Sequence, residues 1–396
     1  MSNNLIFVGN YIDADIQHSR KLPSVNPAAS NRMISLSKAL ASSGNRVIIV
    51  SSSSAASIGF NRRIFIKRMV IKRDSVVIVC SPTVGIPILS SVLELIFLPL
   101  TYLQVLNKIK SVNFVLLYCY YPSLVIVALI SKLLRIKIIE DLQDVSSISF
   151  KYMKNLKFTE KLQQFLGFFS MKLIIKLSTK VLIPTNRFKK FIGSNKKVET
   201  ISGCINNNNK IIYNFNTDEI NILYSGLLNS EQGFYLFMES LKILDRKLIE
   251  KPTNLVFHIS GYGIDRDSIL SLTSNLATLK IQIHGFLSNE AYKELLMRMD
   301  VCLALQDPHG KNSNFKTPSK TYDYFSFAKT VIVSNVGDFK TMPNDCRILL
   351  EPYTAKNLAS ILVSITKKDV VEYGKNALQY ASQNWSYDII SQKILS

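Results

Sequence analysis

Residues 315–337 read FKTPSKTYDYFSFAKTVIVSNVG and predict a loop, a helix, a strand and a second loop, in that order. The proline at 318 and the Ser-Lys-Thr that follows it suit a helix start, because proline is tolerated in a first helical turn and hydroxyls can cap it. Residues 331–333 (VIV) form a short β-branched run, which is typical of a buried strand.

The predicted helix start suits an anionic ligand. Its first backbone N–H groups have no partner within the helix and lie at the positive end of the helix dipole, which favours a phosphate. Asp323 lies in the first turn or so, where its carboxylate could hold sugar or ribose hydroxyls. These features suggest part of a nucleotide-sugar site, whose other parts must come from elsewhere in the chain.

Length and composition indicate a globular protein of two domains. The chain has 396 residues, of which 47% are apolar and 19% charged, which is enough for two full cores and unlike a disordered chain. The formal net charge of +20 indicates an anionic partner: a nucleic acid, an acidic membrane surface or a phosphorylated substrate. The five cysteines show neither CxxC nor Cys/His ligand spacing, which predicts reduced thiols in a reducing compartment. The N-terminus, MSNNLIFVGN, predicts a strand at once, with no signal peptide.

Strands and helices are expected to alternate along the chain, which predicts parallel sheets covered by helices. The predicted strands are residues 5–8, 46–50, 76–80, 114–119, 137–139, 180–183, 220–224, 254–259, 281–284, 301–305, 330–333 and 347–350. A polar loop is expected after the first strand, up to residue 26. The predicted parts are an N-terminal domain (1–205), a linker (206–217), a C-terminal domain (218–375) and a terminal helix and tail packing back toward the N-terminal domain (376–396).

Glycine-containing turns follow several predicted strands of the second half. They contain Gly226, Gly261 and Gly263, Gly285, and residues 334–337 (SNVG). Glycine lets a ligand approach the backbone closely, and the carboxyl ends of parallel strands share one sheet edge, so these turns predict a common binding cleft; ordinary strand-ending turns are the alternative. The sequence has neither a G-x-G-x-x-G opening a βαβ unit nor a P-loop, which argues against a tight dinucleotide site.

Several of these segments together resemble the donor domain of family 4 glycosyltransferases, which have the GT-B fold. The resemblance is carried by ILYSGLLNSEQGFYLFMESL (222–241), FHISGYG (257–263), IQIHGFLSNEAYKELLMRMDVCLAL (281–305) and TPSKTYDYFSFAKTVIVSNVG (317–337). In weaker form it reaches NPAASNRMISLSKALASSGNRVIIVSS (26–52), IIEDLQD (138–144) and STKVLIPTN (178–186).

The resemblance implies an α/β protein of GT-B fold, with two Rossmann-like doubly wound domains facing a central cleft. The N-terminal domain would bind the acceptor and the C-terminal domain a nucleotide-sugar donor. It also implies a retaining, hexosyltransferase-type enzyme, similar to bacterial enzymes of O-antigen, capsule or exopolysaccharide assembly. The expected donor-binding residues are Gly226, Gly261, Gly263, Gly285, Pro318, Ser319, Lys320, Thr321 and Asp323.

The sequence departs from the family pattern at several polar positions. The family often has two glutamates eight residues apart; Asp323 matches the second, whereas the first falls on Phe315. The arginine and lysine that hold the diphosphate in the family fall on Leu227 and Gln232. The histidine found after the fourth strand in many members is missing from residues 118–122 (YCYYP).

Lysines elsewhere could supply the missing positive charge. Related polysaccharide enzymes with a similar LLNSEQG turn also lack the basic pair, as the resemblance suggests. Lys320, Lys316 and Lys311 are the candidates, because a lysine is a good point-charge partner for a phosphate. For Lys320, the alternative is a solvated lysine on a helix.

Acidic residues at the end of a predicted strand supply candidates for a general base. Asp144 matches the family's aspartate at a strand end, and Glu140 and Asp141 are alternatives. Asp144 could equally serve as a structural cap. In a retaining enzyme the departing diphosphate can itself take the acceptor proton, so stabilising that leaving group matters more than a strong base.

Two apolar stretches of the N-terminal half suggest contact with a membrane. Residues 82–106 hold Glu94 as their only charge and could form a spanning helix, an interfacial helix or a buried core helix. Residues 151–197 carry twelve basic residues and one acid around the apolar KLQQFLGFFSMKLIIKL, as in interfacial helices. Solvated charged faces are the alternative.

These observations predict a glycosyltransferase that moves a sugar from a UDP- or GDP-linked donor to a polyprenyl-diphosphate-linked saccharide in surface polysaccharide (lipopolysaccharide, O-antigen or capsule) synthesis. The nucleotide sugar is a substrate, and neither a cofactor nor a metal is expected. The predicted location is the cytoplasm, at the anionic surface of the inner membrane, and no nucleic-acid module is apparent. The alternatives are a non-catalytic GT-B partner of a membrane assembly complex and a sugar-nucleotide epimerase.

Overall fold

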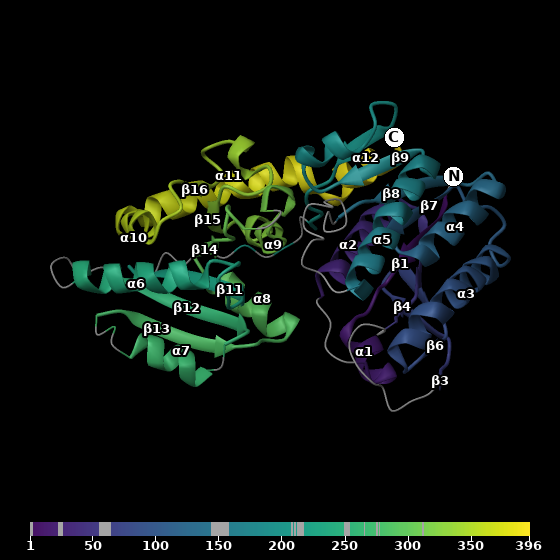
Figure 1. The fold of residues 1–396 in the computed structure, drawn as a ribbon. Coiled ribbons are helices and arrows are strands. Elements are labelled where there is room, and N and C mark those ends of the chain that lie inside the picture. The colour runs from purple at the N-terminus through teal and green to yellow at the C-terminus, as the bar shows by residue number, and fades with distance from the viewer. Residues whose placement is uncertain are drawn as a thin grey trace. The chain divides into compact units, whose positions relative to one another are not determined.

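The computed structural model describes residues 3–22, 27–54, 65–143, 158–206, 209, 211, 218–248, 254–264, 266–274, 276, 278–310 and 313–396 (Figure 1). The chain divides into two compact units. Unit 1 comprises residues 1–204 and 387–396, and unit 2 comprises residues 205–386.

Unit 1 alternates strands and helices (Figure 1). Its elements are β1 (Asn4–Gly9), α1 (Ala14–Arg20), α2 (Ala28–Ser42), β2 (Arg46–Ser51), β3 (Phe65–Ile66), β4 (Met69–Arg73), β5 (Val76–Cys80), β6 (Thr83–Val84), α3 (Pro87–Leu106), β7 (Phe114–Tyr118), α4 (Pro122–Leu133), β8 (Lys137–Asp141), α5 (Phe158–Leu177), β9 (Lys180–Ile183), β10 (Lys197–Thr200) and α12 (Tyr387–Leu395).

The sheet of unit 1 has the strand order β10-β9-β8-β7-β1-β2-β5-β4. Its strands are parallel, except that β4 runs antiparallel to β5 at one edge. Leu5 to Val8 of the central strand β1 are at most 1% exposed, as expected for a strand covered on both faces. Because the chain moves outward from β1 in both directions, helices cover both faces, and the carboxyl ends of the parallel strands lie at one edge.

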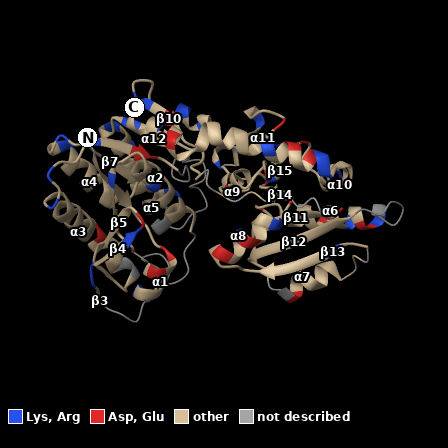
Figure 2. Cartoon of the chain, turned by 180° about the vertical axis from the view of Figure 1, so that it is seen from behind, with Lys and Arg blue, Asp and Glu red and all other residues tan. Residues whose placement is uncertain are grey.

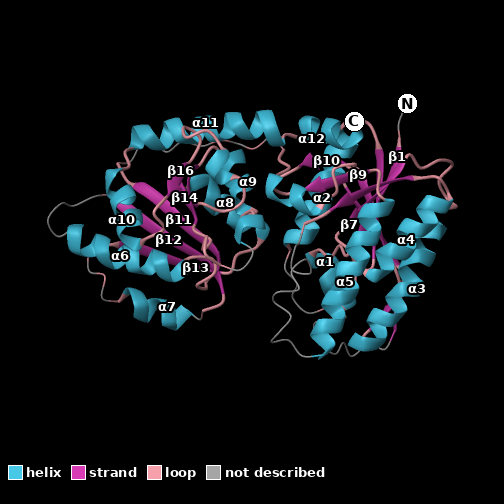
Figure 3. Cartoon of the chain, turned by 45° about the horizontal axis from the view of Figure 1, so that its top comes forward, coloured by secondary structure: helices cyan, strands magenta, loops and turns pink. Residues whose placement is uncertain are grey.

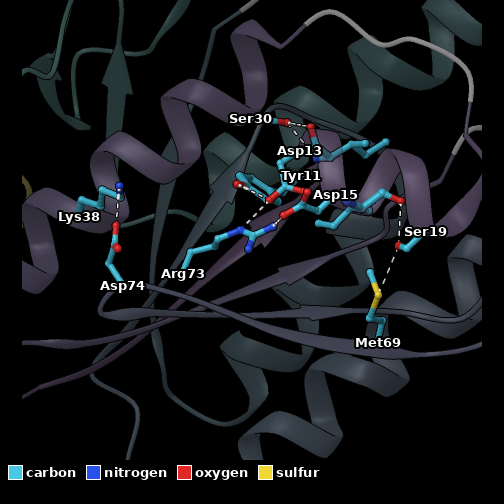
Figure 4. Close-up of polar contacts among 11 residues, drawn as sticks. Tyr11, Asp13, Asp15, Ser19, Ser30, Lys38, Met69, Arg73 and Asp74 are labelled. Atoms are coloured by element: carbon cyan, nitrogen blue, oxygen red, sulfur yellow. Dashed lines mark hydrogen bonds and ion pairs between the residues drawn. The ribbon is translucent and has the colours of Figure 1, made fainter. Parts of the chain in front are cut away.

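The segment predicted to be a polar loop contains the helix α1, so this prediction was wrong. Asp13 caps the helix, because its Oδ1 accepts a hydrogen bond of 2.8 Å from the backbone N–H of Ile16. Arg73, at the end of β4, donates to Asp13 Oδ2 at 3.1 Å and pairs with Asp15 (Figure 4). Seven mostly polar residues give too weak a periodicity to predict a helix, and ion pairs made across the chain are invisible in the sequence.

A buried arginine holds the other end of α1. Arg20 is only 2% exposed, and its guanidinium donates to the backbone carbonyls of Lys67 at 3.2 Å and Ser81 at 3.0 Å. These bonds satisfy a cation that would be costly to bury alone. They anchor α1 beside the antiparallel edge of the sheet.

The C-terminal helix α12 packs in unit 1. Its Ile390 and Ile394 are at most 1% exposed and belong to the same core cluster as Leu36 and Leu40 of α2. The ammonium of Lys180 donates to the carbonyls of Lys393 at 2.8 Å and Ile394 at 3.2 Å, which lie at the C-terminal end of α12. A cation there satisfies carbonyls that have no partner within the helix.

Unit 2 has a fully parallel sheet (Figure 1). Its elements are β11 (Ile220–Leu227), α6 (Phe234–Leu248), β12 (Leu255–Tyr262), α7 (Arg266–Thr273), β13 (Lys280–Gly285), α8 (Asn289–Arg298), β14 (Val301–Ala304), α9 (Lys320–Ser326), β15 (Thr330–Ser334), β16 (Ile348–Leu350), α10 (Ala355–Ser364) and α11 (Lys367–Trp385).

The strand order in unit 2 is β13-β12-β11-β14-β15-β16. This is the order 3-2-1-4-5-6 of a doubly wound nucleotide-binding unit, with the direction of winding reversing between β11 and β14. One core cluster fills each side of the sheet: Phe237 and Leu241 of α6 belong to one, and Phe325 of α9 and Ala377 of α11 to the other. Every strand predicted from the sequence is present in the two sheets, which confirms two Rossmann-like α/β domains.

Helix α11 lies very close to the turn that joins α9 to β15. A Cβ on Gly374 would lie 2.2 Å from the carbonyl oxygen of Ala328, a backbone atom that cannot move aside cheaply. The same region holds Trp385, the single tryptophan of the chain, which is 6% exposed and packs on Phe325 with ring centroids 5.3 Å apart. Trp385 fluorescence therefore reports the packing of this part of unit 2.

We predict that Gly374→Ala lowers the free energy of unfolding of unit 2 by about 1–3 kcal/mol, the usual cost of overpacking. Alanine would otherwise stabilise a helix by roughly 0.5–1 kcal/mol relative to glycine, so a net loss isolates the steric clash. Urea unfolding followed by Trp385 fluorescence measures the effect. Lys375→Ala, at the exposed next position, is the matched control; equal midpoints for the two variants would contradict the close packing of α11.

Candidate functional site

The carboxyl ends of β11 and β12 meet through two glycines. Gly226 and Gly261 are partners in the register of the two strands. Gly261 has φ +150°, and a Cβ there would lie only 1.8 Å from the carbonyl oxygen of Gly226. Only glycine allows this approach. The backbones of the two strand ends are therefore in direct contact at the sheet edge, with no side chain between them.

The other two predicted glycines continue this edge. Gly263, with φ +120°, lies against the turn after β11, where a Cβ would be 3.1 Å from Leu227 Cδ1 and 3.2 Å from Leu228 O. Gly285 has φ +67° and open space around the position of a Cβ, and its carbonyl accepts a 3.0 Å hydrogen bond from Ser260. The four glycines thus lie along one edge, at the ends of β11, β12 and β13.

Lys320 of α9 reaches back to the end of β11. Its Nζ donates to Ser225 Oγ at 3.1 Å and lies 3.2 Å from the position that a Cβ on Gly226 would take. The ammonium also lies 5.6 Å from the ring centroid of Tyr292, within the range of a cation–π contact. The missing side chain of Gly226 therefore leaves room for a cation at the strand end.

The serine that accepts from this ammonium belongs to a network of hydroxyls. Ser225 Oγ lies 3.0 Å from the Tyr324 hydroxyl and 3.4 Å from the Tyr292 hydroxyl. Burial raises the pKa of both tyrosines, so both remain neutral hydrogen-bonding groups. Tyr292 was not predicted as a site residue; the one available signal was its helical spacing with Leu295 and Leu296, which places it on the buried side of α8.

Lys320 and Asp323 place opposite charges on α9. Burial lowers the pKa of Lys320 to about 8, and the nearby carboxylate of Asp323 acts in the opposite direction. Solvent reaches the Asp323 side chain; even so, desolvation by the protein atoms around it raises the pKa of its carboxyl to about 6, against the charges of Lys293 and Lys320. At neutral pH both groups are therefore mainly charged.

The other predicted residues around the start of α9 differ in whether their side chains are free to contact a ligand. Thr321 is buried, and both its N–H (3.1 Å) and its hydroxyl (2.6 Å) donate to the carbonyl of Pro318, so it shapes the turn. Ser319 is exposed and precedes the first helical residue, but its side chain makes no capping bond. The prediction that a hydroxyl caps this helix is therefore wrong for Ser319, whose α-region backbone differs from the extended conformation of a capping residue.

The lysines proposed to replace the family's basic pair lie in different settings. Lys316 forms an ion pair with Glu231 in the turn after β11, and this carboxylate offsets the attraction of Lys316 for an anionic ligand. Lys311 lies outside the described residues. Lys320 is the one whose ammonium the structure places at the strand end. Positive charge at this edge thus comes from α9 in place of positions 227 and 232.

The acidic candidates of unit 1 are held in different ways. Asp141 forms a two-bond ion pair with Arg32 of α2, with both N···O distances 2.8 Å, and accepts a third bond from Gln143. Glu140 is fully buried, neither of its oxygens has a hydrogen-bond partner among the described residues, and burial raises its pKa well above the usual range. This burial argues against Glu140 as a base that reaches a substrate. Asp144 lies outside the described residues.

Two histidines of unit 2 form a pair within the sheet. The rings of His258 and His284 stack with centroids 5.3 Å apart, and Nδ1 of His258 lies 3.0 Å from Nε2 of His284. Asn221 satisfies the other nitrogen of His258, which is buried, whereas His284 is partly exposed. Within the part of the chain that the structure describes, no group of three or more His, Cys, Asp and Glu side chains could hold a metal ion.

Comparison with solved structures shows the fold. No protein-family model and no curated protein matches the sequence. One similar structure is Anabaena HepE (Alr3699) in complex with UDP and glucose, with 13% identity over 99% of this chain and 98% of that one, and a TM-score of 0.61. A second is trehalose-6-phosphate synthase OtsA, with 10% identity over 99% of this chain and 98% of that one, and a TM-score of 0.64. A third is the UDP-forming trehalose-phosphate synthase of Burkholderia xenovorans, with 9% identity over 99% of both chains and a TM-score of 0.65. The likeness covers nearly the whole chain and confirms the GT-B fold predicted from the sequence.

We predict that Gly261→Ala destabilises unit 2 more than Gly285→Ala does. Both glycines have positive φ, so each substitution costs about 1–2 kcal/mol of backbone strain. Gly261→Ala adds the overlap with Gly226, worth a further 1–3 kcal/mol or so. Urea unfolding monitored through Trp385 compares the two variants, and equal losses of stability would show that the strand ends do not approach as closely as described.

Proposed function

We propose that this protein is a glycosyltransferase that moves a sugar from a UDP- or GDP-linked donor to a polyprenyl-diphosphate-linked saccharide. The observation that carries the proposal is the ammonium of Lys320, held over the glycine end of β11 at the carboxyl edge of a doubly wound sheet. Ligands of such sheets bind at this edge, beside the point where the winding reverses. A cation there suits a diphosphate, and the exposed Asp323 carboxylate suits sugar or ribose hydroxyls.

The similar proteins support a nucleotide-sugar donor. HepE was solved with UDP and glucose, and the Burkholderia enzyme is described as UDP-forming. The high net positive charge and the apolar helices of unit 1 support an acceptor carried by a lipid at the cytoplasmic face of the inner membrane. The proposed process is the synthesis of a surface polysaccharide such as O-antigen or capsule.

The proposed transfer is a single exchange at the anomeric carbon. The bond from this carbon to the diphosphate oxygen breaks, and a bond from the acceptor hydroxyl oxygen forms on the same face, with retention. Lys320 and the hydroxyl of Ser225 stabilise the negative charge that develops on the diphosphate. The acceptor proton passes to the departing diphosphate or to Asp144.

A second candidate, a non-catalytic GT-B partner of a membrane assembly complex, is favoured by the acids of unit 1. Asp141 is committed to Arg32, and Glu140 is fully buried. A sugar-nucleotide epimerase is a third candidate; it would convert a free nucleotide sugar without any acceptor.

A panel of UDP- and GDP-sugars incubated with the protein and a bacterial membrane extract tests the proposal directly. Mass spectrometry of the lipid fraction is expected to show an acceptor heavier by one sugar residue. Conversion of a free nucleotide sugar without the extract would establish the epimerase instead. If the protein neither binds nor turns over any of these donors, the non-catalytic partner is favoured.

We predict that Lys320→Met weakens binding of the nucleoside diphosphate roughly 10- to 100-fold, because a hydrogen bond to a charged group contributes about 1.5–3 kcal/mol. Isothermal titration calorimetry with UDP and GDP measures the affinity. Lys356→Met is the matched control, since Lys356 is an exposed lysine of α10 in the same unit. An unchanged affinity in Lys320→Met would rule out its contact with the diphosphate.

The pH dependence provides a second readout of the same contact. In the protein without a ligand, the pKa of the Lys320 ammonium is about 8. The positive charge that attracts the diphosphate is therefore lost as the pH rises through this value. Affinity of the parent protein is therefore expected to fall between about pH 7 and pH 9 more steeply than that of Lys320→Met. Parallel curves for the two proteins would assign the titration to another group.

A further inference from the structure

Helices α3, α4 and α5 form a continuous layer on unit 1 (Figure 3). Helix α4 packs against α3 on one side and α5 on the other. The three helices run in the same direction, because each leads back to the start of the next parallel strand: β7, β8 and β9. Their inner sides are buried, as shown by Tyr102 of α3, Val127 of α4 and Ile174 of α5, all 0% exposed.

The outer side of α3 is apolar. Leu89, Val92, Ile96 and Leu100 recur at a spacing of three or four residues and are 42%, 54%, 52% and 50% exposed. A helix on the surface of a soluble domain normally presents polar residues on this side. Here the exposed stripe is as hydrophobic as the buried one.

Helix α5 and the end of α4 extend this apolar surface. In α5, Leu162, Phe165 and Phe169 are 48%, 52% and 58% exposed and lie on one side of the helix. In α4, Leu129 and Leu133 are 44% and 83% exposed. Exposed apolar residues on three adjacent helices form a patch of the kind that marks a membrane or protein interface.

The charges around the patch are positive. Lys132 and Arg135 are exposed at the end of α4, and Lys172 and Lys176 in the last turns of α5, with Lys172 Nζ 4.5 Å above the ring of Phe168. Helix α4 contains no acidic residue, and residues 161–177 of α5 contain none. Figure 2 shows the three helices mostly in the colour of uncharged residues. This combination complements anionic lipid headgroups above an apolar acyl region.

The one acid of α3 turns away from this surface. Glu94 Oε1 accepts a 2.8 Å hydrogen bond from the Ser123 hydroxyl at the start of α4. Burial raises the pKa of this carboxyl.

The packing of α3 argues for a helix lying on a membrane. Residues 89–106 are long and apolar enough to cross a bilayer by length and composition. However, Leu98, Tyr102 and Val105 are at most 4% exposed and pack inside unit 1, and Tyr102 bonds the Ser131 hydroxyl of α4 at 2.7 Å. A helix with one side in a protein core and the other exposed fits the membrane interface, with its axis in the plane of the bilayer.

We infer that the outer face of α3, α4 and α5 docks unit 1 on an anionic lipid bilayer. The leucine, isoleucine and phenylalanine side chains enter the boundary between headgroups and acyl chains, and the basic residues contact lipid phosphates. Bilayer docking would bring unit 1 to the membrane where the proposed lipid-linked acceptor resides. The inference rests on the surface of unit 1 alone, independently of the donor chemistry.

Vesicle flotation with the full-length protein tests the docking face. The parent is expected to float with vesicles of phosphatidylglycerol and phosphatidylcholine (3:7), and at least tenfold less with phosphatidylcholine alone. Val92→Ser/Ile96→Ser/Phe165→Ser/Phe169→Ser is expected to lose at least tenfold in binding. Tyr235→Ser/Leu270→Ser, which removes two similarly exposed apolar side chains from unit 2, is the matched control and keeps parental binding.

A second variant keeps the test decisive if the quadruple variant fails to fold. Lys172→Ala/Lys176→Ala changes only exposed side chains, and is expected to lose binding to the anionic vesicles while its circular-dichroism spectrum and thermal unfolding match those of the parent. Parental binding in either variant, or no vesicle binding by the parent, would overturn the inference. A parent that forms dimers through this face, broken by the serine substitutions, would assign the face to a second copy of the chain and overturn it equally.

The readouts separate this inference from the proposed function. Flotation uses no nucleotide sugar, so it does not depend on transfer. Loss of transfer with intact flotation would count against the proposed function alone. Failure of the parent protein to float, with intact donor binding, would count against the docking face alone.

Discussion

The candidate site depends on one contact between distant parts of the chain: the ammonium of Lys320 occupies the space beside Gly226, where any other residue would place a side chain. The contact requires the positive φ of Gly226, the hydroxyl of Ser225 and the ring of Tyr292 at the same time. Because the lysine is anchored by these groups, its charge is fixed before a ligand arrives. Preorganised charge of this kind stabilises a developing anion without a reorganisation cost at the moment of reaction.

The same contact places a cation at this edge of the sheet, although positions 227 and 232 hold leucine and glutamine. Leu227 and Gln232 have uncharged side chains and supply no positive charge. Leu227 is one third exposed, and Gln232 lies in the turn stabilised by Asn229. Lys316, close to the same turn, is neutralised by Glu231. The first residue of α9 places its ammonium at the end of β11.

The sequence predicted the fold well because the strands are buried on both faces. Runs such as residues 5–8, 301–305 and 331–333 are continuously apolar, and such runs are typical of parallel sheets. The order of the elements also predicted that the glycines at the strand ends share one edge, whereas Lys320 was a candidate that the family resemblance implied.

Other features depend on contacts between distant residues, which no local pattern encodes. Helix α1 is held by the ion pairs of Asp13 and Asp15 with Arg73, about sixty positions away in sequence. Tyr292 joins the site through a hydroxyl contact across α8 and β11. The burial of Glu140 was hidden for the same reason: acids at the end of a strand suggest a ligand site, but whether each points to solvent depends on the alternation of the strand and on the helices above it.

The return of the C-terminal helix to unit 1 has a practical consequence for dissecting the protein. Unit 1 is assembled from two segments of the chain, and α12 supplies two of its core isoleucines and lies over α2. A fragment ending at residue 204 would leave the apolar side of α2 bare and Lys180 without the carbonyls that it caps. Truncating the chain at a single position therefore gives neither unit complete. A recombinant unit 1 needs residues 387–396 joined to residue 204 by a linker.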